Sequence, residues 1–151
     1  AKWFGNQKYI DKSRIGIFGW SFGGYMASLA MTKGADVFKT GIAVAPVTNW
    51  RYYDSVYTER FLLTPQENPA GYDENSPTTY ANLLKGNFLL IHGTADDNVH
   101  FQNSMEFSEA LIQNKKQFDF MAYPDKDHGI YGGQTRPQLY KKMTDFILEK
   151  L

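Results

Sequence analysis

Four short apolar runs, rich in β-branched and aromatic residues, constrain the fold of this chain more than any other feature. Each run is followed by a segment with helical spacing of its apolar residues or by a turn-rich stretch. Alternating strands and helices predict βαβ units, and hence a mostly parallel sheet flanked by helices on both faces. We therefore expect an α/β fold of about four strands, at residues 14–18, 40–45, 87–91 and 118–123.

The spacing of apolar residues predicts three helices, over 22–33, 104–115 and 137–151. Residues 47–85 break this rhythm, with aromatic residues first and then the turn-rich stretch "TPQENPAGYDENSPTTY". We expect this region to be a helical insertion that caps one edge of the sheet. Ligands of open α/β sheets bind beyond the carboxyl ends of the strands, so the loops after the strands are where chemistry is expected.

Composition excludes several classes of function. Sixteen Lys and Arg balance sixteen Asp and Glu in the 151 residues, and no basic cluster occurs, so we expect no nucleic-acid or membrane-surface partner. Cysteine is absent, which excludes disulfides, zinc-thiolate sites and thiol nucleophiles. The longest apolar runs are well short of the roughly 18 residues that a membrane-spanning helix needs.

The stretch "GWSFGG" (19–24) fits the pattern G-x-S-x-G between a predicted strand and a predicted helix. This context is typical of a nucleophile elbow, in which Ser21 would stand on a sharp, strained turn. We expect side chains at Gly19 and Gly23 to collide with the neighbouring strand and helix. The backbone N–H of Phe22, at the helix N-terminus, could donate to an oxyanion. The alternative is that Ser21 only caps the helix.

A nucleophilic serine needs a base and an acid, and in α/β-hydrolases the chain order is serine, acid, histidine. The stretch "LLIHGTADDNVHF" follows the third predicted strand, and "YPDKDHGIYGG" follows the fourth. His128 is the predicted base because it lies on a different loop from the acid. Asp96 and Asp97 are both candidates for the acid, and spacing alone does not separate them.

A metal site is the rival interpretation of the polar residues after the third strand. His92, Asp96, Asp97 and His100 are close in sequence, but neither an H-E-x-x-H helix nor cysteine ligands support them. We interpret His92 as a structural residue and His100 as part of the entry to the next helix. Because three strand-end loops supply a complete triad, we expect no metal and no cofactor.

Four blocks of sequence together carry a resemblance to a known family: "GWSFGGYMAS", "GIAVAPVTNWRYYDSVYTERF", "LLIHGTADDNVHFQNS" and "YPDKDHGI". They closely resemble the dipeptidyl peptidase branch of the prolyl oligopeptidase family of serine peptidases, from about Arg14 to the C-terminal helix. The resemblance implies that Ser21 is the nucleophile, Asp96 the acid and His128 the base. It also implies an exopeptidase that releases N-terminal dipeptides with proline or alanine at the second position.

The resemblance further implies a proline pocket. Positions 50, 53 and 57 have the spacing of one helix face, and flat aromatic walls suit a pyrrolidine ring. Ordinary core packing is the alternative for these aromatic residues. The implied substrate-binding residues are Trp50, Tyr53, Tyr57, Asn98, Val47 and Val99.

An α/β-hydrolase domain has about eight strands, so the resemblance predicts that residues 1–151 are the C-terminal part of a catalytic domain. An oxyanion-completing tyrosine and a β-propeller that holds the substrate amine would then lie upstream. We expect the chain by itself to be nearly inactive, with an unpaired edge on its first strand.

Two other functions share these sequence features. An acylaminoacyl peptidase or esterase would use the same triad without a proline pocket. A dimerisation or binding module would use the amphipathic segment "PQLYKKMTDFILEKL", because the resemblance implies a homodimer through C-terminal helices; an ordinary surface helix is the alternative. The resemblance and the absence of cysteine favour a bacterial periplasmic or secreted protein.

Overall fold

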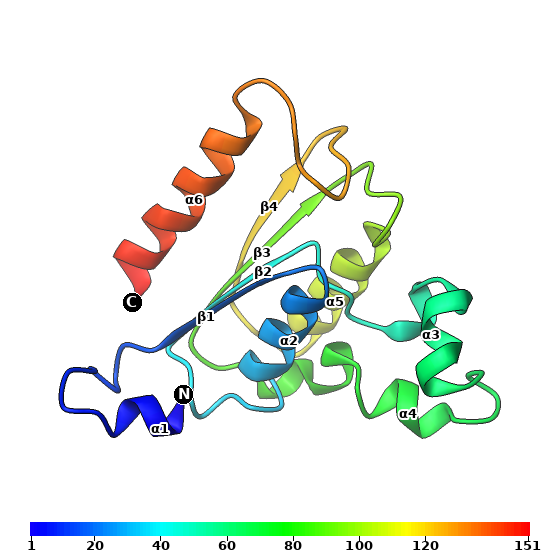
Figure 1. The fold of residues 1–151 in the computed structure, drawn as a ribbon, viewed down its shortest axis with the longest axis horizontal. Helices are drawn as coiled ribbons and strands as arrows, with labels where there is room; N and C mark the ends of the chain where they lie inside the picture. The colour runs from blue at the N-terminus through cyan, green and yellow to red at the C-terminus, as the bar shows by residue number, and fades with distance from the viewer.

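A four-stranded sheet forms the centre of the computed structural model, which describes all 151 residues (Figure 1). The strand order is β1 (Gly16–Trp20), β2 (Thr40–Val44), β3 (Asn87–Gly93) and β4 (Asp119–Tyr123). All three strand pairings are parallel. The carboxyl ends of the four strands therefore lie at one edge of the sheet, and the expected α/β fold is confirmed.

The first strand is shifted by two residues from the predicted range 14–18. Gly19 and Trp20 still pair with Ala43 and Val44 of β2, so the ladder continues beyond the apolar run. Pairing with a neighbouring strand decides where a strand ends. A glycine such as Gly19 has a low strand propensity, so the local sequence does not predict that the strand continues through it.

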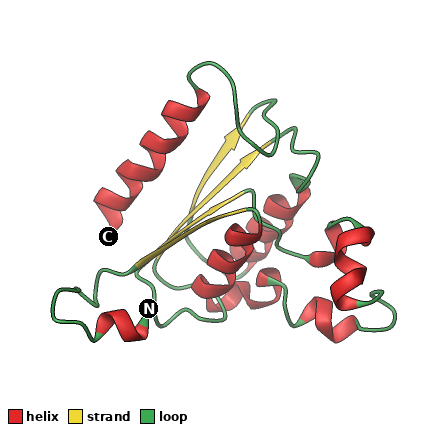
Figure 2. Cartoon of the chain, viewed as in Figure 1, coloured by secondary structure: helices red, strands yellow, loops and turns green.

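Helices cover both faces of the sheet (Figure 2). α2 (Phe22–Met31) and α5 (Gln102–Gln113) lie on one face, and α6 (Thr135–Lys150) lies on the other. Along β2, Ile42 and Val44 pack toward α6, whereas Ala43 packs toward α2 and α5. Both faces are apolar because each is covered, as the continuous apolar runs predict.

The insertion between β2 and β3 is helical, but it does not cap a sheet edge. Its last piece contributes Ala81, with Leu84 directly after it, to the apolar core shared with α2 and α5. Because the insertion leaves β2 and returns to β3, which are the two central strands, both of its ends are held away from the edges. Its pieces are η1 (Trp50–Tyr52), α3 (Ser55–Leu62), α4 (Pro69–Asp73) and η2 (Pro77–Leu83).

Hydrogen bonds hold the C-terminal end of α6 at the edge of the sheet where the amino ends of the strands lie. Thr40 Oγ1 and Asn87 Nδ2 donate to the carbonyl oxygen of Lys150 at 3.0 and 3.1 Å, and Arg14 Nε donates to that of Leu151 at 2.9 Å. The helix thus runs along the sheet with its N-terminal end toward the carboxyl edge (Figure 1). α1 (Lys2–Gly5) is a single turn, and no helix has the length and apolarity needed to cross a membrane.

Candidate active site

Ser21 occupies a strained turn between β1 and α2. Its φ of 59° and ψ of −118° place a non-glycine residue in a conformation that L-amino acids rarely adopt. Its N–H donates to the carbonyl of Val44 at 2.8 Å, and its own carbonyl accepts from the N–H of Tyr25 at 3.0 Å. The Ser21 hydroxyl makes no capping hydrogen bond, so the interpretation of this serine as a helix cap is not supported.

Two glycines make this turn sterically feasible, but they are not both the predicted ones. A Cβ atom at Gly19 would lie 1.9 Å from the carbonyl oxygen of Gly23, and one at Gly24 would lie 2.8 Å from that of Val44. A Cβ atom at Gly23 would meet nothing within 4 Å. The prediction of a collision at Gly23 is therefore wrong, because Gly23 presents its carbonyl to Gly19 while its own Cβ direction is open.

Phe22 is the first residue of α2. The N–H groups of the first turn of a helix have no intrahelical partner, and they lie at the positive end of the helix dipole. The N–H of Phe22 is therefore suited to donate to a negative oxygen that forms next to Ser21.

Asp96 is a buried carboxylate on the loop after β3, and four hydrogen bonds hold it. Its Oδ1 accepts from the N–H groups of Asn98 and Val99 at 3.0 and 2.9 Å. Its Oδ2 faces His128 Nδ1 at 2.7 Å and His92 Nε2 at 3.1 Å. Burial by itself raises the pKa of Asp96, but the hydrogen bonds from His128, His92 and Asn98 outweigh it and hold that pKa well below its usual range.

His128 reaches Asp96 from the loop after β4, with its side chain 23% exposed. Since His128 Nδ1 donates its hydrogen to Asp96, His128 Nε2 carries no hydrogen in the neutral ring and can accept a proton. The backbone of this loop is fixed from two sides: the Trp20 indole N–H donates to the carbonyl of His128 at 3.0 Å, and Arg136 Nε donates to that of Gly129 at 2.9 Å. The Arg136 guanidinium also lies over the Trp20 ring, 5.1 Å from its centroid. Neither Trp20 nor Arg136 was predicted to have a role; the position of Trp20, directly before Ser21, was the one available signal.

The loop after β3, which carries Asp96 (the acid loop), and the loop after β4, which carries His128 (the base loop), are hydrogen-bonded to each other. The N–H of Thr94 donates to the carbonyl of Tyr123 at 2.9 Å, and that of Ala95 donates to the carbonyl of Lys126 at 3.0 Å. The approach is so close that a Cβ atom at Gly93 would lie 2.3 Å from the Lys126 oxygen. Asp96 and His128 therefore belong to one rigid unit at the ends of two adjacent strands.

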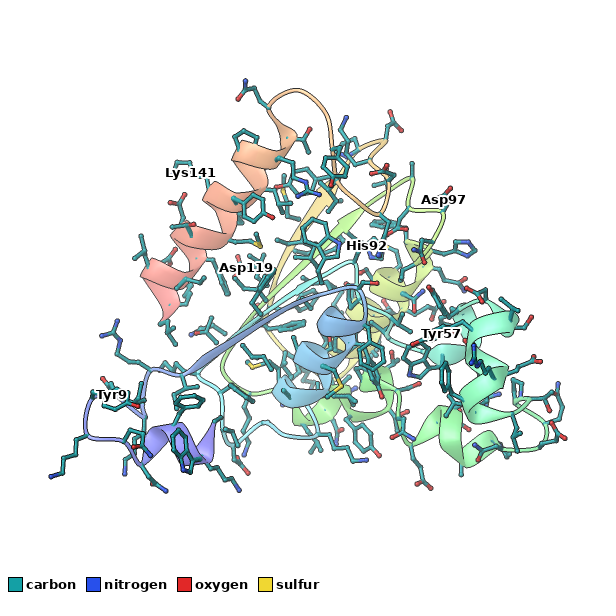
Figure 3. The ribbon with its side chains drawn as sticks, in the orientation of Figure 1. Tyr9, Tyr57, His92, Asp97, Asp119 and Lys141 are labelled. Carbon is teal, nitrogen blue, oxygen red and sulfur yellow. The ribbon has the colours of Figure 1, made fainter.

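The residues of the rival metal interpretation do not converge. His92 and Asp96 are hydrogen-bonded to each other, whereas Asp97 and His100 line a separate polar cleft of about 730 Å³. Figure 3 shows Asp97 away from His92, which lies at the end of β3. No group of three or more His, Cys, Asp or Glu side chains in the chain is arranged to hold a metal ion. His100 lies in the turn before α5, as expected.

The aromatic rings of the insertion contact one another, but the prediction that they share one helix face is wrong. Trp50 belongs to η1 and Tyr57 to α3, and the chain turns between them at Tyr53 and Asp54. The rings of Trp50 and Tyr57 are stacked with centroids 6.1 Å apart, and Tyr53 meets both edge-on at 5.9 and 5.4 Å. Asp54 stabilises the turn, because its side chain accepts from the N–H of Tyr57 at 2.8 Å.

An open groove of about 490 Å³ adjoins this cluster, and its wall begins at Phe22, next to Ser21. Val47 and Val99 do not line this groove; they are buried in the core cluster behind Trp50. Phe61 was missed as a lining residue, although it lies four residues after Tyr57 on α3. The groove is lined by Phe22, Tyr25, Trp50, Tyr57, Thr58, Phe61, Leu62 and Asn75.

A polar pair lies beside the aromatic cluster. The Tyr53 hydroxyl donates to Asn98 Oδ1 at 2.8 Å, which joins the insertion to the acid loop. Burial, together with the negative charges of Asp54 and Asp96, raises the pKa of Tyr53.

Comparison with known proteins gives this geometry a family. The model of the prolyl oligopeptidase family matches residues 1–151. The chain belongs to this family. A dipeptidyl peptidase 4 of Felis catus is 49% identical over 150 residues, covering 97% of this chain and 20% of the relative. A probable dipeptidyl-aminopeptidase B of Paracoccidioides brasiliensis is 48% identical over 153 residues, covering 98% of this chain and 17% of the relative.

Two solved structures superpose closely on this chain. The crystal structure of Porphyromonas gingivalis dipeptidyl peptidase 4 gives a TM-score of 0.96 at 52% identity, covering 97% of this chain and 21% of that one. The structure of a putative dipeptidyl aminopeptidase IV from Bacteroides ovatus gives a TM-score of 0.95 at 36% identity, covering 99% of this chain and 21% of that one. The fold is thus an α/β-hydrolase fold, and the chain spans about a fifth of the length of the relatives it matches.

Proposed function

We propose that this chain carries the nucleophile, acid and base of a serine exopeptidase that releases N-terminal dipeptides with proline or alanine at the second position. The observation that carries the proposal is the 2.7 Å hydrogen bond between Asp96 and His128, at the same sheet edge as the strained Ser21 turn. Membership of the prolyl oligopeptidase family and the names of the similar proteins support the reaction class. Because the chain is much shorter than these relatives, we further propose that it acts as part of a longer catalytic domain.

The proposed reaction is acyl transfer in two steps. His128 Nε2 takes the proton of Ser21 Oγ while that oxygen bonds to the carbonyl carbon of the second substrate residue, and Asp96 stabilises the resulting imidazolium. The N–H of Phe22 donates to the carbonyl oxygen as it becomes negative. His128 then gives the proton to the amide nitrogen as the scissile C–N bond breaks. The amine departs, and the dipeptide remains bound to Ser21 Oγ as an ester. Water, activated by the same imidazole, releases the dipeptide and restores the Ser21 hydroxyl.

The aromatic groove is proposed to set the preference at the second substrate residue. The stacked rings of Trp50 and Tyr57 offer flat apolar surfaces in the groove that Phe22 also lines. A pyrrolidine ring or a methyl group can lie against such surfaces, whereas larger side chains need more depth. Tyr53 and Asn98 line the neighbouring polar cleft instead. The Tyr53 hydroxyl and Asn98 would bind polar groups of the substrate.

Covalent labelling tests the nucleophile. In the full-length protein that carries this chain, Ser21→Ala is expected to abolish labelling by a fluorophosphonate, because it removes the hydroxyl that is the proposed nucleophile. The matched control is Ser55→Ala, which changes an exposed serine of α3 and should leave labelling intact. Persistent labelling of Ser21→Ala would show that another residue is the nucleophile.

Substrate profiling tests the specificity. The full-length protein should cleave a Gly-Pro arylamide faster than arylamides with a larger second residue, and Tyr57→Ala should reduce that preference. An esterase or acylaminoacyl peptidase would show no preference for proline. The 151-residue chain alone should be nearly inactive, since the loss of one oxyanion donor costs about 100- to 1,000-fold in turnover. Efficient turnover by the chain alone would contradict the proposal that it is incomplete.

Two further proposals concern partners and compartment. The exposed apolar side chains of Tyr140, Ile147 and Leu148 on α6 support a homodimer through this helix. A bacterial periplasmic or secreted location is proposed from the family resemblance, and the organisms of the two similar solved structures support a bacterial source.

A further inference from the structure

We infer that His92, oriented by its hydrogen bond with Ser104, is a positioning residue that fixes the Asp96 carboxylate for His128. The inference rests on the proposed function, because it assigns a role behind the proposed triad. It extends the hydrogen-bonded chain inward from the loops to α5, in the order His128, Asp96, His92 and Ser104.

The hydrogen-bond partners of His92 fix its tautomer. Its Nε2 lies 2.8 Å from the carbonyl oxygen of Val99 and 3.1 Å from Asp96 Oδ2, and both of these atoms can only accept. Nε2 therefore carries the hydrogen. Nδ1 lies 2.6 Å from Ser104 Oγ, so a neutral His92 accepts there and the Ser104 hydroxyl donates. The side chain of His92 is fully buried, so these contacts are shielded from solvent.

His92 completes the set of donors around Asp96. Two backbone N–H groups hold Oδ1, and His92 is the one partner of Oδ2 besides His128. Without His92, the negative charge of Oδ2 would be satisfied by His128 alone. A stronger pull on His128 stabilises its imidazolium, so the neutral base would form only at higher pH. The other charged groups near the base loop are Asp125, Lys126 and Asp127 within it, Asp97 beside Asp96, and Arg136 on α6. They stay unchanged in the His92, Ser104 and Ser108 variants below.

The first experiment measures the rate of fluorophosphonate labelling of the full-length protein from about pH 5 to about pH 9, the range in which histidine titrates. His92→Leu is expected to slow labelling about 10- to 100-fold, the usual effect of losing a partner behind a reacting group, and to move the acid limb of the profile to higher pH. His92→Gln keeps an N–H donor, so its labelling rate and its acid limb should both lie between those of His92→Leu and the unmodified protein. An unchanged rate and acid limb in folded His92→Leu would overturn the inference.

A second pair of variants avoids any change at His92. Ser104→Ala removes the hydroxyl that donates to His92, and Ser108→Ala removes a buried hydroxyl one turn later on α5 that has no hydrogen-bond partner. We expect Ser104→Ala to slow labelling about 3- to 10-fold with a shifted acid limb, as the loss of one hydrogen bond implies, and Ser108→Ala to change neither. Equal effects of the two variants, or no effect of Ser104→Ala, would overturn the inference. If the unmodified protein is not labelled at all, the proposed function fails instead.

Discussion

Asp96 is the residue whose ionisation depends most strongly on the fold. Burial opposes its charge, but the hydrogen bonds from His128, His92 and Asn98 lower its pKa below that of an unfolded aspartate, which is about 3.9. The unfolded state therefore binds a proton first as the pH falls. The stabilisation that comes from this carboxylate is complete above about pH 4 and is lost as the pH falls toward the lower folded-state pKa.

The free energy of unfolding should reveal this depressed pKa. We expect it to fall more steeply with decreasing pH, below about pH 4, in the unmodified protein than in Asp96→Asn, which has no proton to take up. Urea denaturation at a series of pH values measures the two slopes. Equal slopes would mean that the Asp96 pKa is not depressed by folding.

The same substitution separates the two adjacent aspartates in function. Asp96→Asn should slow fluorophosphonate labelling about 10,000-fold, the scale known for a triad histidine held in the wrong tautomer. The matched control is Asp97→Asn, which changes the neighbouring exposed carboxylate and should leave the labelling rate nearly unchanged. Similar losses in both variants would contradict the proposed role of Asp96.

At the residue scale, the sequence predicted the types of side chain better than their partners. Spacing could not separate Asp96 from Asp97, because both directly follow the same strand; burial and the turn that closes on Oδ1 distinguish them in the structure. The pairing of His92 with Ser104 could not be predicted, because a serine on a helix carries no signal of what its buried face meets. Val47 and Val99 were assigned to the pocket surface, but apolar side chains beside an aromatic cluster can equally well lie behind it.

At the scale of elements, the strand-to-helix turn depends on individual glycines in different ways. Gly19→Ala should disrupt the turn, because the new Cβ atom would lie 1.9 Å from a backbone oxygen that cannot move aside without shifting α2. Gly23→Ala is the control within the same motif, since its Cβ atom would point into open space. We expect Gly19→Ala to lower stability by about 3 kcal/mol or more and to abolish labelling, while Gly23→Ala stays within about 1 kcal/mol. Thermal unfolding and labelling measure both; a well-tolerated Gly19→Ala would contradict the geometry.

Trp20 couples this turn to the base loop. Trp20→Phe keeps an aromatic ring near Arg136 but removes the indole N–H that donates to the carbonyl of His128. One net hydrogen bond is worth about 1 kcal/mol, so labelling should slow about 5-fold as the base loop loosens. Kinetics of labelling at neutral pH measure the effect, and a rate equal to that of the unmodified protein would mean that the loop does not need this bond.

The helices and strands themselves were largely predictable, because the spacing of apolar residues and the content of β-branched residues directly reflect which side chains are buried. β2, β3 and β4 lie within one or two residues of their predicted bounds, whereas β1 ends later because its pairing with β2 continues through Gly19 and Trp20. The insertion was predicted to be helical but was placed at the wrong part of the sheet. Its position follows from contacts between η2, α2 and α5, which are far apart in sequence.

At the scale of the whole molecule, β1 is an edge strand with its outer side unpaired in this chain. Phe18 on this strand is 53% exposed, and Leu148 on α6 is 79% exposed. Unpaired strand edges and exposed apolar residues both favour association. We expect the 151-residue chain to form concentration-dependent oligomers.

Two variants distinguish these surfaces in gel filtration over a range of concentrations. Phe18→Lys should reduce association if it occurs through β1, because a lysine on an edge strand opposes strand pairing. Leu148→Lys should reduce association if α6 forms the interface. A chain that stays monomeric without either substitution would contradict both expectations.

The hydrogen bonds between the loops after β3 and β4 have a consequence for how such a site could be rebuilt. Because the N–H groups of Thr94 and Ala95 are hydrogen-bonded to β4 and the loop after it, the carboxylate and the imidazole are presented together by one module of two adjacent parallel strands. Ser21 arrives separately, two strands away. Transplanting this chemistry onto another parallel sheet is therefore a problem of aligning two parts rather than three, and the single adjustable quantity is the distance of the serine turn from a preassembled acid–base pair.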